Sequence, residues 1–150
     1  MILQRLNSLE ARIRLYPQAV INETINILNR STDQIKGFIT EELSKGFDAE
    51  GKKIGDRKPY KSEKYAQFKT QLNPLPGKGN PDLKLRGNFY DGIKVEVQGQ
   101  DLVAEGVDFK TPILEARYGD VVGFNPVVRE RIVDEILRPQ LLVFTQNYFN

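Results

Sequence analysis

The sequence predicts an α+β domain with long amphipathic N-terminal helices, a central β-hairpin or small antiparallel sheet, and a C-terminal helix. Apolar residues follow helical spacing through residues 1–46, apolar and polar residues alternate on both sides of Gly99, and an Asn-Pro pair precedes a last helical stripe. At 150 residues, 39% of them hydrophobic, the chain is long enough to bury its own core. We expect a single domain with three parts: a helical segment at 1–46, an extended basic arm or loop at 47–82, and an α+β core at 83–150.

Two amphipathic helices are predicted in the N-terminal segment. The first carries apolar residues on one side, at Ile2, Leu6, Leu9, Ile13 and Tyr16. Pro17 is expected to end or kink it. The second has a stripe of seven positions, at Ile21, Ile25, Leu28, Thr32, Ile35, Ile39 and Leu43. Gly46 then stands where a helix C-cap favours glycine.

These two stripes carry more apolar surface than one small sheet easily covers. They therefore pack either within the chain or against a neighbouring subunit. The candidate oligomer-interface residues are Ile2, Leu6, Leu9, Ile13, Ile21 and Ile25.

Residues 47–82 are predicted to form a long loop with one short helix. Ser62 is a typical N-cap, and Tyr65, Phe68 and Leu72 share one face of the helix that follows. The prolines and glycines after that helix exclude further regular structure. Because connections of this length are usually functional or flexible, we expect an arm that orders against partners.

The middle of the chain is basic. Residues 45–94 hold 12 Lys and Arg against 6 Asp and Glu, whereas the remaining residues hold 10 against 14. Two interpretations stay open, a solvated loop and a surface that contacts phosphates. The stretch lacks the closely spaced aromatic platform of single-strand binders, and the only candidates for stacking on bases are Tyr60, Tyr65 and Phe68. The candidate partner-binding residues of the arm are Lys52, Lys53, Arg57, Lys58 and Tyr60.

The alternation around Gly99-Gln100 predicts a β-hairpin with a type II′ turn. This turn fixes the register, in which Val97 faces Leu102, Val95 faces Ala104 and Lys94 faces Glu105.

Two further helices are expected after the hairpin. Thr111 is expected to cap a short helix that has Pro112 in its first turn and ends at Gly119. Asn125 and Pro126 begin the last helix, which Pro139 should bend or end. The stripe of that helix is Val128, Ile132 and Ile136.

The composition excludes several chemistries. Without cysteine there is no disulfide or thiolate nucleophile, and without histidine there is no serine–histidine triad. Pro81-Asp82 followed by Glu96-Val97-Gln98 resembles a metal-dependent nuclease motif, although Gln98 stands where that motif has lysine. We expect a protein that is not an enzyme and has no cofactor and no metal. The alternative is a nucleic-acid-binding module or a magnesium-dependent nuclease that uses residues 45–94.

No membrane association is expected, because no stretch approaches the 18 apolar residues that a membrane span needs. The arginines before Tyr16 and the lack of a long uncharged run are not typical of a secretory signal. We expect a protein that stays in the cytoplasm or is built into something assembled there.

Four passages carry a resemblance to a known family. They are residues 56–60 after a glycine-rich turn, residues 83–89 leading into the hairpin, the helix 113–119, and the turn 123–126 before the last helix. The matched positions include Leu85, Gly87, Phe89, Tyr118 and Gly119. This order resembles that of the tail-completion or virion-morphogenesis proteins of tailed bacteriophages, small subunits of the neck between head and tail.

The resemblance implies a structural virion subunit that forms a homo-oligomeric ring in the head–tail connector, or neck, or at the tail end. It implies other virion proteins as partners, namely portal, connector or tail subunits, together with non-specific contact with DNA in the channel. The implied location is the virion, assembled in the host cytoplasm. The two-helix N-terminus lies outside the resemblance, and we interpret it as an addition that docks on a neighbouring ring.

Overall fold

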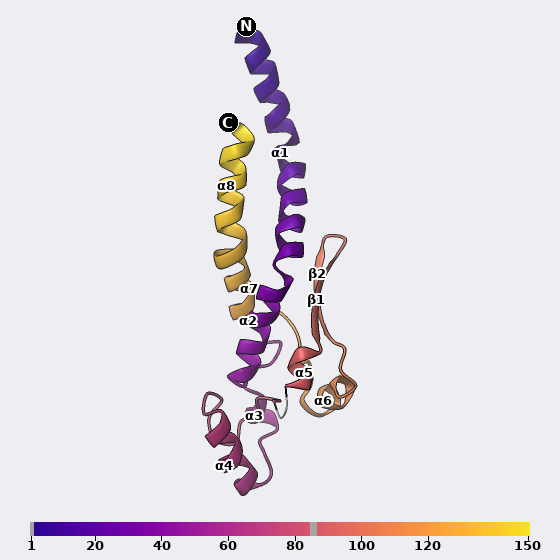
Figure 1. Ribbon diagram of the computed structural model, residues 1–150, viewed down its shortest axis with the longest axis vertical. Helices are drawn as coiled ribbons and strands as arrows, with labels where there is room; N and C mark the ends of the chain where they lie inside the picture. Colours follow the sequence, from indigo (N-terminus) through magenta and orange to yellow (C-terminus); the bar gives the residue numbers. More distant parts are fainter. Residues whose placement is uncertain (1, 85–86) are drawn as a thin grey trace.

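The computed structural model describes residues 2–84 and 87–150, and the side chains of Ile2 and Arg57 lie outside the described part. The described residues form helices and one antiparallel pair of strands joined by turns, which confirms the predicted α+β class. The first and last helices lie antiparallel along the upper part of an elongated molecule, and the hairpin lies beside them (Figure 1). The elements are α1 (Ile2–Arg30), α2 (Thr32–Ser44), α3 (Ile54–Arg57), α4 (Glu63–Leu72), α5 (Asn88–Asp91), β1 (Ile93–Gln98), β2 (Asp101–Gly106), α6 (Thr111–Tyr118), α7 (Pro126–Arg131), a π-helical segment (Ile132–Leu137) and α8 (Arg138–Phe149).

Helix α1 continues through Pro17, so the prediction that Pro17 ends the first helix is wrong. The break between the two N-terminal helices falls at Ser31 instead. Proline removes one backbone hydrogen bond, here to the carbonyl of Ile13, and both residues are exposed, so water can satisfy that carbonyl. Contacts of α8 with the flanking residue Tyr16 support the helix across this position.

The core lies where α1 and α2 meet β1 and the segment that leads into α8. The C-terminal part of the second predicted stripe, from Ile35 to Leu43, lies in this core, so the chain itself covers these apolar side chains. The aliphatic side chains that are at most 2% exposed there include Ile27, Ile35, Ile39, Leu43, Ile93, Val121, Val128 and Ile136. In contrast, Ile21 keeps 40% of its surface exposed.

The hairpin has the predicted register, with Val97 opposite Leu102 and Lys94 opposite Glu105. Gly99 has a φ of 64° and Gln100 a negative φ, which is the type II′ geometry. Strand β1 turns Ile93 and Val95 into the core.

The last helix also continues through its proline, so an end at Pro139 is wrong. The preceding segment is π-helical, and the backbone N–H of Arg138 bonds to the carbonyl of Val133, five residues back. This wider turn makes room for the proline ring, which would otherwise crowd the carbonyl of Glu135. Earlier in the chain, Lys110 rather than Thr111 is the N-cap of α6, and the buried hydroxyl of Thr111 has no hydrogen-bond partner.

The predicted cap at Asn125 is confirmed. Its side-chain oxygen accepts a hydrogen bond from the N–H of Val128 at 2.9 Å, and its amide donates to the carboxylate of Glu42 at 3.4 Å. Replacing Asn125 with alanine should destabilise the protein by about 2 kcal/mol, because both the helix N–H and a buried carboxylate lose a partner. Urea unfolding measures this loss. Asn125→Ser keeps a capping oxygen and should recover part of it, whereas equal losses in the two variants would contradict a capping role.

Candidate functional site

Residues 47–82 are folded, in contrast to the extended arm expected from the sequence. With the end of α2 they form a lobe at the end of the molecule opposite the N-terminus (Figure 1). Helices α3 and α4 build this lobe, and Ile54 and Ala66 are at most 4% exposed within it. Three buried charged residues, Asp48, Lys69 and Asp82, lie in this stretch, which makes the lobe a candidate for a functional site.

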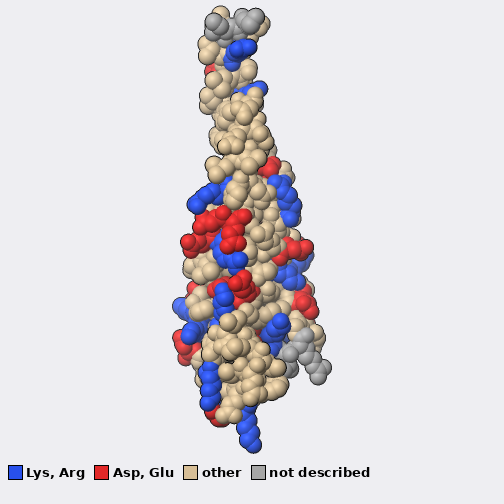
Figure 2. Space-filling model, turned by 60° about the vertical axis from the view of Figure 1, so that its left-hand side comes forward, with Lys and Arg blue, Asp and Glu red and all other residues tan. Residues whose placement is uncertain are grey.

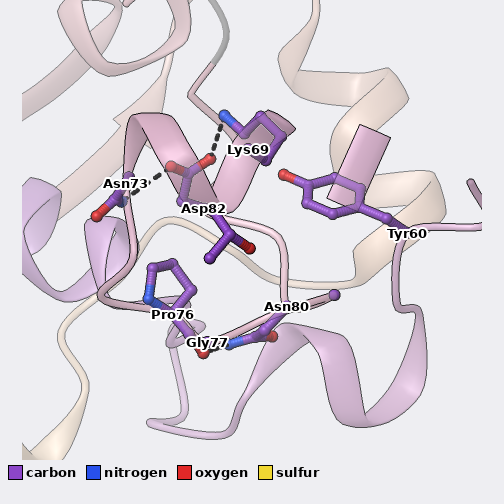
Figure 3. A pocket seen from close by; sticks show the side chains of 9 residues that line it. Tyr60, Lys69, Asn73, Pro76, Gly77, Asn80 and Asp82 are labelled. Atoms are coloured by element: carbon purple, nitrogen blue, oxygen red, sulfur yellow. Dashed lines mark hydrogen bonds and ion pairs between the residues drawn. The ribbon is translucent and has the colours of Figure 1, made fainter. Parts of the chain in front are cut away.

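An ion pair between Lys69 and Asp82 stands at the centre of the lobe (Figure 3). The ammonium and carboxylate are 2.8 Å apart, and the two side chains are only 7% and 3% exposed. The amide of Asn73 donates to Asp82 at 3.0 Å, and the backbone N–H of Lys84 donates to the other carboxylate oxygen at 3.0 Å. The hydroxyl of Tyr90 donates to the backbone carbonyl of Asp82. The charge of the Asp82 carboxylate is thus neutralised by Lys69, and both of its oxygens accept hydrogen bonds from the protein.

Asn80 joins the turns around this ion pair. Its side-chain oxygen accepts from the backbone N–H of Gly55, and its amide donates to the carbonyls of Pro76 at 3.2 Å and Gly46 at 3.4 Å. A Cβ at position 55 would lie 2.7 Å from the Cα of Asn80, so only glycine fits there. Tyr60 lies beside the same centre, where burial and the charge of Asp82 raise the pKa of its hydroxyl.

This centre stabilises the lobe and offers no space to a substrate. The gap among Tyr60, Lys69, Asn73, Asn80 and Asp82 is too narrow to admit a water molecule. Lys69 is one of the 12 basic residues of the stretch 45–94, for which the sequence predicts a solvated loop or a phosphate-contacting surface. A usable signal was the spacing of Ala66 and Lys69, which are three residues apart and therefore share the inner face of α4.

The two carboxylates of the nuclease-like pattern have different local partners. Asp82 is engaged by Lys69, whereas Glu96 lies on the hairpin with Lys94 at 2.7 Å and Gln98 as its partners. Within residues 2–84 and 87–150, no three acidic side chains gather as metal ligands.

The outer face of α4 is aromatic and exposed. Ser62 caps the helix as predicted, but the residues that share its apolar face point to solvent, with Tyr65 38%, Phe68 49% and Leu72 61% exposed. The ring of Tyr65 lies 5.0 Å from that of Tyr60 and 6.3 Å from that of Phe68. The three aromatic residues therefore form one continuous group.

The predicted partner-binding lysines belong to the same lobe. Lys52, Lys53 and Lys58 are exposed, and Lys52 pairs with Glu50 at 2.6 Å. Figure 2 shows basic side chains along the edges and at the tip of the lower end of the molecule. The side chain of Arg57 lies outside the described atoms.

The N-terminal end of α1 presents a second exposed surface. We call its four apolar residues the α1 tip, and they are Leu3, Leu6, Leu9 and Ile13, with 75%, 56%, 43% and 57% of their surface exposed. Helix α8 ends level with Arg12, whose carbonyl accepts a hydrogen bond from Tyr148 at 3.0 Å. The tip thus extends past α8 (Figure 1), and this end is mostly uncharged in Figure 2.

The remaining predicted interface residues differ from the tip. Ile21 is partly exposed and Ile25 is half-buried, while the side chain of Ile2 lies outside the described part. Of the positions that carry the family resemblance, Phe89 and Tyr118 are buried in the core. Gly87 and Gly119 have positive φ values at helix ends, and Leu85 lies outside the described residues.

The described helices include none that is both long and apolar enough to cross a membrane. Comparisons of this chain with protein-family models, with curated proteins and with solved structures gave no match.

Proposed function

We propose that this protein is a structural subunit of a tailed-bacteriophage particle, which forms a homo-oligomeric ring in the head–tail connector or neck, or at the tail end. The α1 tip is the observation that carries this proposal, because a stripe of four exposed apolar side chains on one helix is typical of a protein contact surface. The kind of assembly, a phage particle, is inferred from the sequence resemblance that begins at about Gly46. Portal, connector or tail subunits are the expected partners.

The energetics of α1 support a partner at its N-terminal end. Residues 3–10 are exposed and lie beyond the level at which α8 ends. Most helical stability in proteins comes from packing of an apolar face, so this end of α1 gains stability when another surface covers it. The polar centre of the lobe supports a structural role, since Lys69 and Asp82 pair with each other and leave no space for a substrate.

Light scattering and electron microscopy of the purified chain, together with localisation of a tagged chain in purified phage particles, test this function. We expect an oligomer with a ring-shaped projection, and the tag at the neck or tail end. A chain that stays monomeric at high concentration and is missing from particles would refute the proposal.

One observation favours a second function, the binding of single-stranded nucleic acid. Tyr60, Tyr65 and Phe68 are contiguous, and exposed lysines lie nearby in sequence on both sides, at Lys58, Lys61 and Lys64. Aromatic rings that stack on bases, combined with cations that neutralise phosphates, are the common basis of such binding.

Under this second function, replacing Tyr65 and Phe68 together with alanine should weaken binding of a labelled oligothymidylate at least about tenfold, because stacking contributes 1–3 kcal/mol per base. Fluorescence anisotropy at several salt concentrations measures the affinity. Leu72→Ala is the matched control, since it removes an exposed apolar side chain from the same helix face without removing a ring. If the wild-type chain binds no oligonucleotide at low salt, this function is excluded.

A further inference from the structure

The seam between α1 and α8 continues into the α1 tip. Leu6, Leu9 and Ile13 are followed at the same spacing by Tyr16, which packs against α8. The hydroxyl of Tyr16 lies 2.6 Å from that of Thr145, and its ring lies 5.0 Å from that of Phe149. Since α8 stops there, the tip has the shape of a helix-pairing surface whose partner must come from another molecule.

An apolar groove lies along the same two helices, α1 and α8. This α1–α8 groove has a volume of about 480 Å³ and is lined by Glu23, Arg30, Pro139, Gln140, Val143, Phe144 and Asn147. Val143 is 57% exposed, and the adjacent Leu142 is 59% exposed. The apolar wall of the groove is therefore open to solvent, as the tip is.

The two surfaces are similar in length. At 1.5 Å per residue, the tip spans about 15 Å from Leu3 to Ile13, and the groove lining on α8 spans about 12 Å from Pro139 to Asn147. A tip laid along the groove could therefore contact the full length of its α8 wall.

The tip of one copy could pair either with the groove or with the tip of another copy, and charge favours the groove. The region around the tip carries Arg5, Arg12 and Arg14 against Glu10, so two tips that pair bring a net positive charge against a net positive charge. In the groove, Glu23 and Arg30 neutralise each other at 3.1 Å. The groove therefore accepts the basic tip without this repulsion.

We propose that the α1 tip of one copy of this chain packs into the α1–α8 groove of the next copy. The inference rests on the proposed function and gives the ring its subunit contact. Because tip and groove are different surfaces, each copy donates a tip to one neighbour and accepts a tip from the other. Such a head-to-tail contact produces a closed ring when the rotation between copies closes.

The lack of cysteine in this chain permits a direct test by disulfide cross-linking. Leu6→Cys and Val143→Cys change two exposed residues, and the two single variants are mixed, one of them carrying a mass tag. Disulfides form only where the two Cβ atoms approach within about 4.5 Å. We expect mild oxidation to produce mainly the mixed dimer, together with a ladder of higher species from the double variant.

Gln100→Cys, at the exposed hairpin turn, is the matched control and should give only background cross-linking with Leu6→Cys. Dimers formed mainly between two Leu6→Cys chains would overturn the proposal in favour of tip–tip pairing. An oligomer by light scattering without the mixed dimer would overturn this contact and leave the subunit role standing. A strict monomer would overturn the contact as well, and the localisation in particles would then decide the subunit role separately.

Discussion

Replacing Asp82 with alanine is expected to destabilise the protein by about 3–5 kcal/mol, because it leaves the ammonium of Lys69 buried without a counter-charge. The amide of Asn73 and the backbone N–H of Lys84 lose their acceptor at the same time. Urea unfolding of the wild type and the variant measures the difference in the free energy of unfolding.

Two further variants separate the buried charge from simple loss of contacts. The double variant Lys69→Met with Asp82→Asn removes both charges, nearly keeps the volume and retains an acceptor oxygen at position 82, so it should lose less stability than Asp82→Ala alone. Lys52→Ala removes a cation from an exposed ion pair and should leave the unfolding midpoint unchanged within error. A loss below about 1 kcal/mol for Asp82→Ala would show that the ion pair does not hold the lobe together.

Replacing Leu6 and Ile13 together with aspartate is expected to weaken self-assembly by about 10²–10⁴-fold. Each side chain contributes about 1.5–3 kcal/mol when it becomes fully buried, and the two losses act on the same contact. The stability of the isolated chain should change little, since both side chains are more than half exposed. A dilution series followed by light scattering measures assembly, and thermal unfolding of the dissociated chain measures stability.

The matched control for the tip is a pair of equally exposed apolar residues elsewhere. Val107 and Ile113 are 62% and 64% exposed and lie outside α1 and α8. Their replacement by aspartate should leave assembly intact. Equal weakening by both double variants would mean that general apolar surface, and not the tip, drives association.

The hairpin could be predicted from the sequence because its information is local. Gly99 selects the turn, the turn sets the register, and alternation then decides which face is buried. The same holds for Asn125, whose capping partner is three residues away.

The predictions that were wrong concern positions whose structure depends on residues far away in the sequence. Pro17 and Pro139 are compatible with continuous helices because α1 and α8 support each other and a π-helical turn absorbs one ring. Lys69 belongs to the buried centre because Asp82, 13 residues later in the sequence, folds back onto it. That pairing also sets the rotation of α4, in which Lys69 faces inward and Phe68, about 100° around the helix, remains 49% exposed.

The hydrogen bond between Gly55 and Asn80 also has an evolutionary consequence. It brings together the two ends of residues 56–79, so this stretch leaves the body and returns to it at one point. Changing the length of such a closed excursion costs little, about 0.6 kcal/mol for each doubling. During evolution, insertions in the turns beside α4 are therefore tolerated while the paired helices and the hairpin keep their geometry, provided that Lys69 keeps its buried ion pair with Asp82.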